Sequence, residues 1–312
     1  IPALQAAETL DACIQAVLAQ DAGEEFDITI AVGPSGDDTR AIADAAAAVY
    51  PNVRVVDNPS GATPSALNAA IAASEGPIVA RVDAQSILPA GYLRRSAATL
   101  ARTGAANVGG VQRPVGNHGR QATIAAAMAS SFGSGPARFR RGSVEGPVDT
   151  VYLGVFLRSA LESVGGFDDS MRRNQDYDLN RRLRAAGHLV WFDPELVVEY
   201  RPRPTLGRLW DQHWQYGAWK RYSLMQAPKS LRVRQLAAPA LVIGLAFSLG
   251  ALLAGSLLGL VIPVLYLLAA VVACMRCPVT GLRNRAVLLT AFATMHLGWG
   301  SGFLVGRRGG RT

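Results

Sequence analysis

The stretch DITIAVGPSGDDTRAIADAAAAVYPNVRVVDNPSG, residues 27–61, indicates the fold of the first part of the chain. Asp27–Val32 is a short apolar run with β-branched residues, which predicts a strand ending at the turn sequence of residues 33–36. Asp37–Val49 is rich in alanine and predicts a helix, and Val53–Val56 predicts a second strand. This order is typical of a parallel βα unit.

The same pattern continues along the chain. Pro64–Ser74 predicts a helix and Pro77–Val82 a strand that ends at Asp83-Ala84-Gln85. Repeated βα units predict an α/β domain with an open, doubly wound sheet, whose ligands bind beyond the carboxyl ends of the strands. Asp83 lies at such an end. A strand normally precedes the first turn of such a fold, so we expect the chain, which begins at Ile1-Pro2, to start inside it.

Composition excludes several classes of protein. Of the 312 residues, 50% are hydrophobic and 17% charged, so the chain can bury a core and is not disordered. Three cysteines are too few for a disulfide scaffold. Residues 1–211 carry 20 Lys or Arg and all 23 Asp and Glu, whereas residues 212–312 carry 11 Lys or Arg and no acid. Because long apolar runs share this basic segment, it indicates a membrane surface rather than a nucleic acid as partner.

A run of 40 residues without a formal charge, Leu236–Met275, is too long for one membrane crossing of about 30 Å. We expect helices over 236–254 and 258–275 joined by a turn, and a third over 286–306. The predicted domains are therefore residues 1–230, with an amphipathic interfacial segment at 205–230, and a membrane domain at 231–312.

Arginines flank the predicted hairpin on both sides, at Arg232 and Arg234 and again at Arg276, Arg283 and Arg285. The positive-inside rule therefore places the N-terminal domain on the cytoplasmic side of a multi-pass cell-membrane protein. The basic residues after the third run conflict with a simple third crossing; they are Arg307, Arg308 and Arg311. Either that run is re-entrant or the rule is overridden there.

Two acidic sites suggest chemistry. Asp83, with the amide oxygen of Gln85, offers the hard oxygen ligands that suit Mg²⁺ or Mn²⁺ on a substrate diphosphate, although a lone Asp at a strand end is also a common turn former. Leu179 and Leu183 recur at helical spacing and place Asp176 in the first turn of a helix, where the helix dipole favours a carboxylate. Such a group can act as a general base or merely cap the helix.

Two basic segments have open interpretations. Aromatic residues alternate with cations between Arg201 and Arg221, which fits an interfacial helix, a lid whose cations neutralise a leaving diphosphate, or both. Residues 134–142 form a basic loop bounded by glycines, and its Arg138 and Arg140 either bind phosphate or are solvated.

Together these segments resemble glycosyltransferase family 2, most closely its succinoglycan-biosynthesis-type members with C-terminal membrane helices. The matching segments are Ile1 to Glu8, Leu18 to Gln20, Asn58-Pro59, Ala66 to Ala70, Val151 to Gly154, Gly165 to Asp168, Gln175-Asp176, Gln215 to Arg221 and Met295 to Gly300. The resemblance covers almost the whole chain, and its strength lies in the order of the motifs and the 93-residue spacing from Asp83 to Asp176.

The resemblance implies a GT-A fold and an inverting glycosyltransferase that moves a sugar from a nucleotide-diphosphate sugar to a lipid-linked or polysaccharide acceptor. It implies a divalent cation, Mn²⁺ or Mg²⁺, at Asp83 and Gln85, and the catalytic pair Gln175-Asp176 with Asp176 as base. The implied donor-binding residues are Pro2, Ala3, Glu8, Asn58, Asn68, Asp83, Arg138, Arg140, Gln215, Trp219, Lys220 and Arg221.

The sequence departs from the family pattern at two places. Asp83-Ala84-Gln85 stands where the family has Asp-x-Asp, and Gly33-Pro34 stands where its nucleotide-binding acids are expected. The missing metal carboxylate favours an alternative, a non-catalytic sugar-nucleotide-binding or scaffold subunit of a polysaccharide assembly complex, while the retained Gln175-Asp176 pair opposes it. A dinucleotide-dependent enzyme is excluded because no G-x-G-x-x-G follows the first strand.

Overall fold

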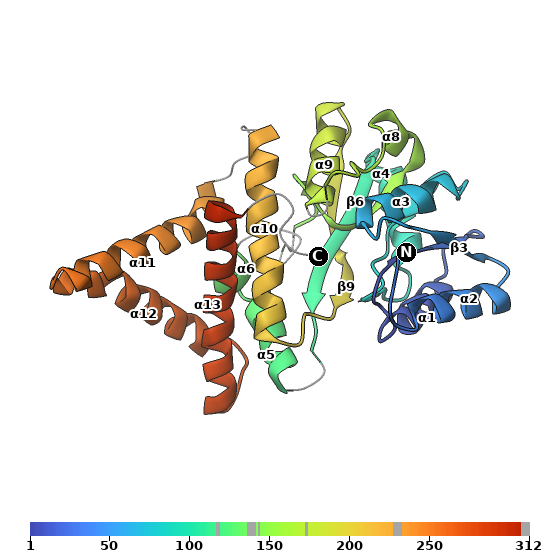
Figure 1. The fold of residues 1–312 in the computed structure, drawn as a ribbon. Helices are drawn as coiled ribbons and strands as arrows, with labels where there is room; N and C mark the ends of the chain where they lie inside the picture. The colour runs from blue at the N-terminus through green and yellow to red at the C-terminus, as the bar shows by residue number, and fades with distance from the viewer. Residues whose placement is uncertain (117–118, 136–141, 143, 172–173, 227–232, 307–312) are drawn as a thin grey trace. The chain divides into compact units, whose positions relative to one another are not determined.

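The computed structural model describes residues 1–312 except 117–118, 136–141, 143, 172–173, 227–232 and 307–312 (Figure 1). The chain divides into two compact units. The first contains Ile1–Arg113 and Ala137–Tyr200, and the second contains Pro114–Pro136 and Arg201–Thr312. Residues 114–136 and 201–230, predicted from the sequence to be part of the first domain, are in this division grouped with the C-terminal helices.

The first unit opens with three parallel strands in the order β1-β2-β3, with Ile28 opposite Val53 and Val32 opposite Asp57. The strands and their helices are β1 (Pro2–Ala3), α1 (Leu10–Leu18), β2 (Ile28–Val32), α2 (Thr39–Val49), β3 (Val53–Asp57) and α3 (Thr63–Ala72). Every residue of β2 is buried, as its apolar sequence requires. The parallel βα units predicted for this part are confirmed.

The second sheet of this unit differs from the expected parallel pattern. Its strands run in the order β4-β8-β6-β9-β5, with β7 on β9. They are β4 (Ile78–Ala80), β5 (Ser86–Ile87), β6 (Asn107–Pro114), β7 (Gly146–Pro147), β8 (Tyr152–Leu157) and β9 (Val190–Tyr200). The pairings of β4 and β6 with β8, and of β5 and β7 with β9, are antiparallel. The partner of β4 is a strand more than 70 residues later, which local periodicity does not reveal.

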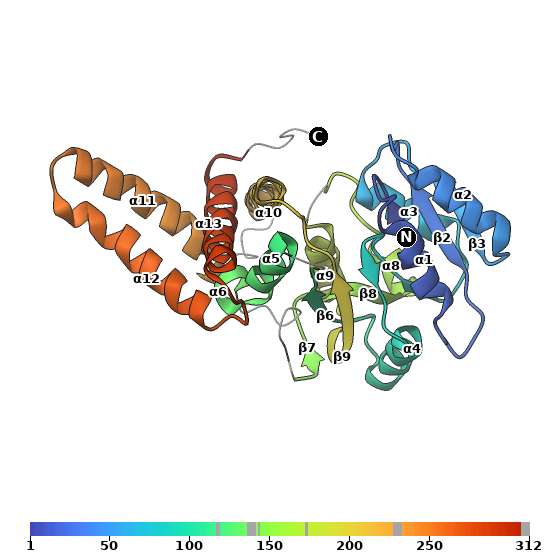
Figure 2. The same ribbon diagram turned by 90° about the horizontal axis from the view of Figure 1, so that it is seen from below.

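Three of the described helices cover this sheet. They are α4 (Tyr92–Thr103), α8 (Arg158–Ser163) and α9 (Gln175–Ala185). Figure 2 shows α4 on one side of the strands and α8 and α9 on the other. The arrangement gives the sheet two covered faces, and it places the first turn of α9 over the end of β4.

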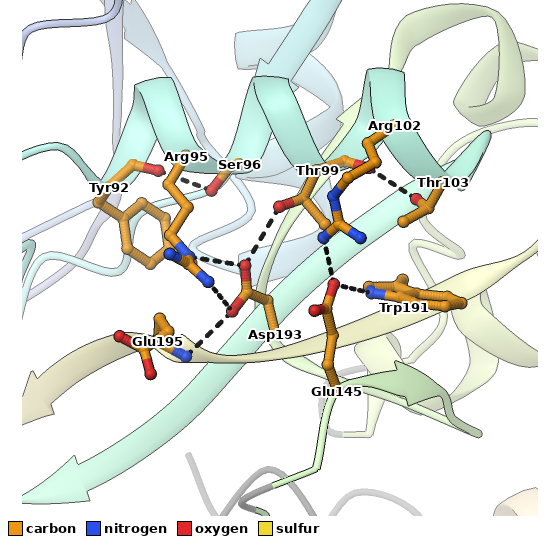
Figure 3. Close-up of polar contacts among 10 residues, drawn as sticks. All are labelled: Tyr92, Arg95, Ser96, Thr99, Arg102, Thr103, Glu145, Trp191, Asp193 and Glu195. Atoms are coloured by element: carbon orange, nitrogen blue, oxygen red, sulfur yellow. Dashed lines mark hydrogen bonds and ion pairs between the residues drawn. The ribbon is translucent and has the colours of Figure 1, made fainter.

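A buried carboxylate ties α4 to β9 (Figure 3). Asp193 has no exposed surface and accepts hydrogen bonds from Arg95 at 2.8 and 3.0 Å, from Thr99 Oγ1 at 3.1 Å and from the Glu195 N–H at 3.0 Å. Burial alone would raise the pKa of Asp193, but these bonds outweigh it and the pKa is lowered. Asp193 is therefore a structural anion of the fold.

The second unit is helical. Its helices are α5 (Gly119–Ala129), α6 (Ser131–Ser134), α10 (Leu206–Gln226), α11 (Ala237–Leu253), α12 (Val261–Met275) and α13 (Leu282–Val305), with short 3₁₀ turns at Val233–Leu236 and Leu257–Leu260. Helices α11 and α12 form a hairpin that projects away from α13 in both views (Figures 1 and 2). Leu257–Met275 and Leu282–Val305 are long and apolar enough to cross a membrane, while α11 is apolar but shorter.

Helices α10 and α13 pack closely because glycines line their contact. A Cβ atom on Gly302 would lie 2.1 Å from the Trp214 carbonyl oxygen, and one on Gly217 would lie 2.0 Å from the Trp299 carbonyl oxygen. These distances are far inside van der Waals contact, so only glycine fits at either position. The two helices are therefore packed backbone against backbone.

Candidate active site

The structure brings Asp83 and Asp176 together through a third residue, Arg81. The Nε and Nη2 atoms of Arg81 each lie 2.9 Å from Asp83 Oδ1, and its Nη1 donates to Asp176 Oδ1. Asp83 follows strand β4, and Asp176 is the second residue of helix α9. The two acids that the sequence singled out therefore lie together and contact the same guanidinium.

Arg81 comes from the chain just after β4 and is 7% exposed. Its backbone N–H donates to the Gly154 carbonyl oxygen at 3.1 Å, which continues the pairing of β4 with β8. Burial alone would lower the pKa of Arg81, but Asp176 and Asp83 raise it above its ordinary value. The guanidinium is therefore a permanent positive charge in the site.

Arg81 is not among the residues predicted from the sequence, although a signal for it is present. Residues two apart on an extended chain point to the same side, so an arginine two positions before Asp83 is placed to meet its carboxylate.

Helix α9 begins as the sequence predicts. Asn174 stands before it at φ 59°, a left-handed conformation that asparagine tolerates well, and the chain then enters the first turn with Asp176. Leu179 and Leu183 are fully buried in the core beneath the helix. The apolar face thus fixes which way Asp176 points, and the prediction of a first-turn position is confirmed.

The Asp176 carboxylate is 41% exposed. Loss of hydration raises its pKa above the ordinary aspartate value, and Asp83 adds to this, while Arg81 acts in the opposite direction. A raised pKa makes the carboxylate a stronger base, and its exposure leaves it open to a ligand. Asp176 can therefore accept a proton from a bound hydroxyl group.

The other acid on this helix has a different environment. Asp178 is buried and accepts from Arg181 Nη2 at 2.7 Å and from Arg182 Nε at 2.8 Å. These hydrogen bonds stabilise the first turns of α9, so Asp178 has a structural role. Gln175, the other half of the predicted catalytic pair, is also buried.

The predicted metal ligands are Asp83 and Gln85. Among the residues that the structure describes, no group of three or more His, Cys, Asp or Glu side chains could hold a metal ion. Arg81 already contacts Oδ1 of Asp83, and Gln85, which is partly buried, contributes no charge. These donors fit a cation that is held jointly with a ligand's phosphate oxygens, and they do not form a cation site by themselves.

The predicted donor-binding asparagines have partners within the protein. Asn68 donates to the Phe167 carbonyl oxygen at 2.7 Å and accepts from the Phe167 N–H at 2.9 Å. Asn58 is buried, donates to the Ala62 carbonyl oxygen at 3.1 Å and accepts from Ser60 Oγ at 2.8 Å. Both amides therefore shape loops of the first unit. Their proposed contacts with a donor stay predictions.

The remaining donor-binding predictions fall in three places. Pro2 and Ala3 form β1 and pair with Ala31 and Val32, and Glu8 is exposed before α1. Helix α10 of the second unit carries Gln215, Trp219, Lys220 and Arg221. Arg221 there donates from Nη1 to the Leu304 carbonyl oxygen at 2.7 Å, and Lys220 is buried. Arg138 and Arg140 lie outside the described residues.

Comparison with known proteins agrees with this fold. The family described as "Glycosyltransferase like family 2" matches residues 1–217, which is most of the chain. The chain belongs to glycosyltransferase family 2. The parallel β1–β3 unit and the Asp83 and Asp176 positions all lie within the matched residues.

Relatives of this family 2 chain extend the likeness beyond the matched segment. It is 31% identical over 307 residues to the succinoglycan biosynthesis protein ExoA of Rhizobium meliloti (strain 1021), covering 97% of this chain and 92% of that protein. It also resembles a solved mannosyltransferase, PcManGT from Pyrobaculum calidifontis in complex with GDP-Man and Mn²⁺, with a TM-score of 0.65, 18% identity and coverage of 94% and 85%. The likeness to S. aureus TarS has a TM-score of 0.50, 14% identity and coverage of 69% and 38%. The solved structures establish a GT-A, Rossmann-like α/β fold.

Proposed function

We propose that this family 2 chain is an inverting glycosyltransferase whose catalytic base is Asp176. The carboxylate removes a proton from an acceptor hydroxyl group, and the resulting oxygen attacks the anomeric carbon in line with the leaving nucleoside diphosphate. The observation that carries the proposal is the cluster of Asp176, Arg81 and Asp83 at the carboxyl end of β4, where α/β folds bind ligands.

The proposed donor is a nucleotide-diphosphate sugar. The mannosyltransferase PcManGT was solved in complex with GDP-Man and Mn²⁺, which supports this class of donor and a divalent cation. Asp83, assisted by Gln85, would hold the cation against the diphosphate, where a bound cation supplies positive charge to the leaving group. The protein itself provides the anchoring carboxylate, that of Asp83.

The proposed acceptor is a lipid-linked or growing polysaccharide in exopolysaccharide or cell-envelope synthesis, as the name of ExoA suggests. A membrane location is supported by the exposed apolar side chains of the α11–α12 hairpin, which include Phe247, Leu257 and Leu265. We propose a multi-pass cell-membrane protein with the first unit on the cytoplasmic side, where nucleotide sugars are made. Membrane lipid is then a further partner, and nucleic acid is not.

The proposal is tested with the full chain purified in detergent. Thermal-shift screening against a panel of nucleotide sugars, with and without Mn²⁺, identifies the donor. Release of nucleoside diphosphate is then followed with membrane extracts as the source of acceptor, and the anomeric configuration of the product is determined by NMR. We expect one donor to stabilise the protein and the product to have the inverted configuration.

Retention of configuration would contradict the proposed base mechanism. Donor binding without transfer to any lipid or glycan acceptor would instead favour the non-catalytic subunit that the single charged metal ligand allows.

A further inference from the structure

We infer that Arg81 is a positioning residue, which holds the Asp176 carboxylate in the orientation for proton removal. The inference rests on the proposed function of Asp176. Among the described residues, Arg81 provides the one polar contact that the structure gives to the Asp176 carboxylate. The carboxylate is 41% exposed, so without this contact it would rotate freely into solvent.

The backbone on both sides of the ion pair is fixed by other contacts. Arg81 N–H is bonded to the Gly154 carbonyl oxygen of β8. Helix α9 is held by Asn180, which accepts from Asn107 Nδ2 at 2.6 Å and donates to Thr150 Oγ1 at 2.9 Å. Removal of the Arg81 guanidinium would therefore leave α9 in place while releasing the Asp176 side chain; Asp83, the other acid that it contacts, would lose the same partner.

The geometry also explains why an arginine stands here. One edge of the guanidinium, Nε and Nη2, contacts Asp83, while Nη1 contacts Asp176. A planar group with several donors can bridge two carboxylates in this way, whereas the single nitrogen of a lysine cannot hold both in the same geometry. Arg81→Lys therefore keeps the positive charge and removes the bridge.

The experiment compares Arg81→Lys and Arg81→Met with a matched control. Arg158 is a second largely buried arginine of this unit, and its side chain donates to the Gly76 and Ile71 carbonyl oxygens and to Ser74 Oγ, so Arg158→Met removes a structural guanidinium. We expect both Arg81 variants to lower kcat by about 10²-fold and to change the donor KM by less than about twofold. The control should keep its kcat per folded molecule.

A double-mutant cycle with Asp176→Asn decides whether Arg81 acts through Asp176. If it does, Arg81→Met causes no further loss of rate once Asp176 is asparagine. A further loss in that background, or a large rise in the donor KM, would show that Arg81 acts on the donor and overturn the inference. If Arg81→Met does not fold, Arg81→Lys takes its place in the same cycle.

Different results would contradict the catalytic role of Asp176 and the positioning role of Arg81. Normal transfer by Asp176→Asn would remove the proposed base and, with it, the positioning role. Normal kcat in Arg81→Lys and Arg81→Met, beside an inactive Asp176→Asn, would overturn the positioning role alone.

Discussion

Arg81, beside the end of strand β4, and Asp176, in the first turn of helix α9, form an ion pair across 95 positions of the sequence. Arg81 also pairs with Asp83, so that two carboxylates share one guanidinium. With both acids ionised, the cluster carries one net negative charge. A site of this charge favours either uptake of a proton by Asp176 or binding of a cation beside Asp83, and the proposed mechanism uses both.

The first prediction concerns Asp176→Asn. The amide has nearly the same shape but cannot take up the acceptor proton, so we expect transfer to fall by about 10²–10⁴-fold while donor affinity stays nearly unchanged. Asp178→Asn on the same helix is the control, because the Asp178 carboxylate accepts hydrogen bonds from Arg181 and Arg182 of its own helix. Initial rates and donor titrations on both variants make the comparison. Full activity of Asp176→Asn would exclude it as the base.

The second prediction concerns pH. In the proposed mechanism transfer needs the deprotonated form of Asp176, so the rate should fall as the pH drops through the pKa of this group. Loss of hydration and the neighbouring Asp83 raise that pKa, so activity is lost at a higher pH than an ordinary aspartate would give. Since Arg81 lowers the same pKa, Arg81→Met moves the acid limb of the kcat profile to still higher pH. A profile whose acid limb does not move in this variant would contradict the assignment.

Local signals in the sequence predict the elements of this site well. The apolar run before Gly33 and the Leu179 and Leu183 spacing place a parallel strand and a helix where the structure has them. Such signals work because strand and helix periodicity are set by residues close in the chain. The position of Asp83 after its strand and that of Asp176 in the first turn of its helix follow from the same periodicity.

Long-range pairing is what the sequence does not reveal. The antiparallel pairing of β4 with β8 depends on register across more than 70 residues, and no turn signal joins the two strands. The contact of Arg81 with Asp176 is not predictable from the sequence for the same reason. It forms only when the fold brings α9 over the end of β4. The hydrogen bonds that Asn58 and Asn68 make within the protein also cannot be predicted from the sequence, because they depend on the geometry of the loops.

A third prediction concerns the metal. Gln85→Asp adds a second charged oxygen ligand beside Asp83, so Mn²⁺ affinity of the donor-bound protein should rise by roughly tenfold, or about 1.4 kcal/mol. Isothermal titration of Mn²⁺ into the wild type and the variant, each saturated with donor, measures the change. Gln85→Glu is a useful second variant because its carboxylate tests the same ligand with a longer side chain. If Mn²⁺ has no effect on donor affinity in any of these proteins, transfer does not use a cation at Asp83.

A fourth prediction separates structural acids from catalytic ones. Arg95→Met leaves the buried Asp193 carboxylate with hydrogen bonds from Thr99 and the Glu195 N–H but without its cation. Leaving a buried charged acceptor undersatisfied costs about 2 kcal/mol, so the melting temperature of the protein should fall by several degrees. Transfer per folded molecule should stay the same, because Asp193 anchors α4 to β9 and does not face the Asp176 cluster. A lower rate at unchanged stability would assign this anion to the reaction.

The last prediction concerns the membrane. Helices α11 and α12 have no formal charge and expose apolar side chains along the hairpin, so both should insert, with their joining turn on the outer side. Helix α13 packs backbone against backbone on α10, which carries Arg208, Asp211, Lys220 and Arg221. A helix with four formal charges does not enter hydrocarbon, so we expect α13 to lie beside it at the cytoplasmic interface without crossing.

Single cysteines at Ser256, Asn284 and Val305 test this topology in a protein from which Cys13, Cys274 and Cys277 have been removed. An impermeant thiol reagent added to intact cells should label the position in the α11–α12 turn, Ser256. It should leave Asn284 and Val305 at the two ends of α13 unlabelled until the cells are opened. Labelling of Val305 together with Ser256 would show that α13 crosses the membrane. Labelling of Asn284 alone would invert the hairpin and place the proposed donor site outside the compartment that supplies nucleotide sugars.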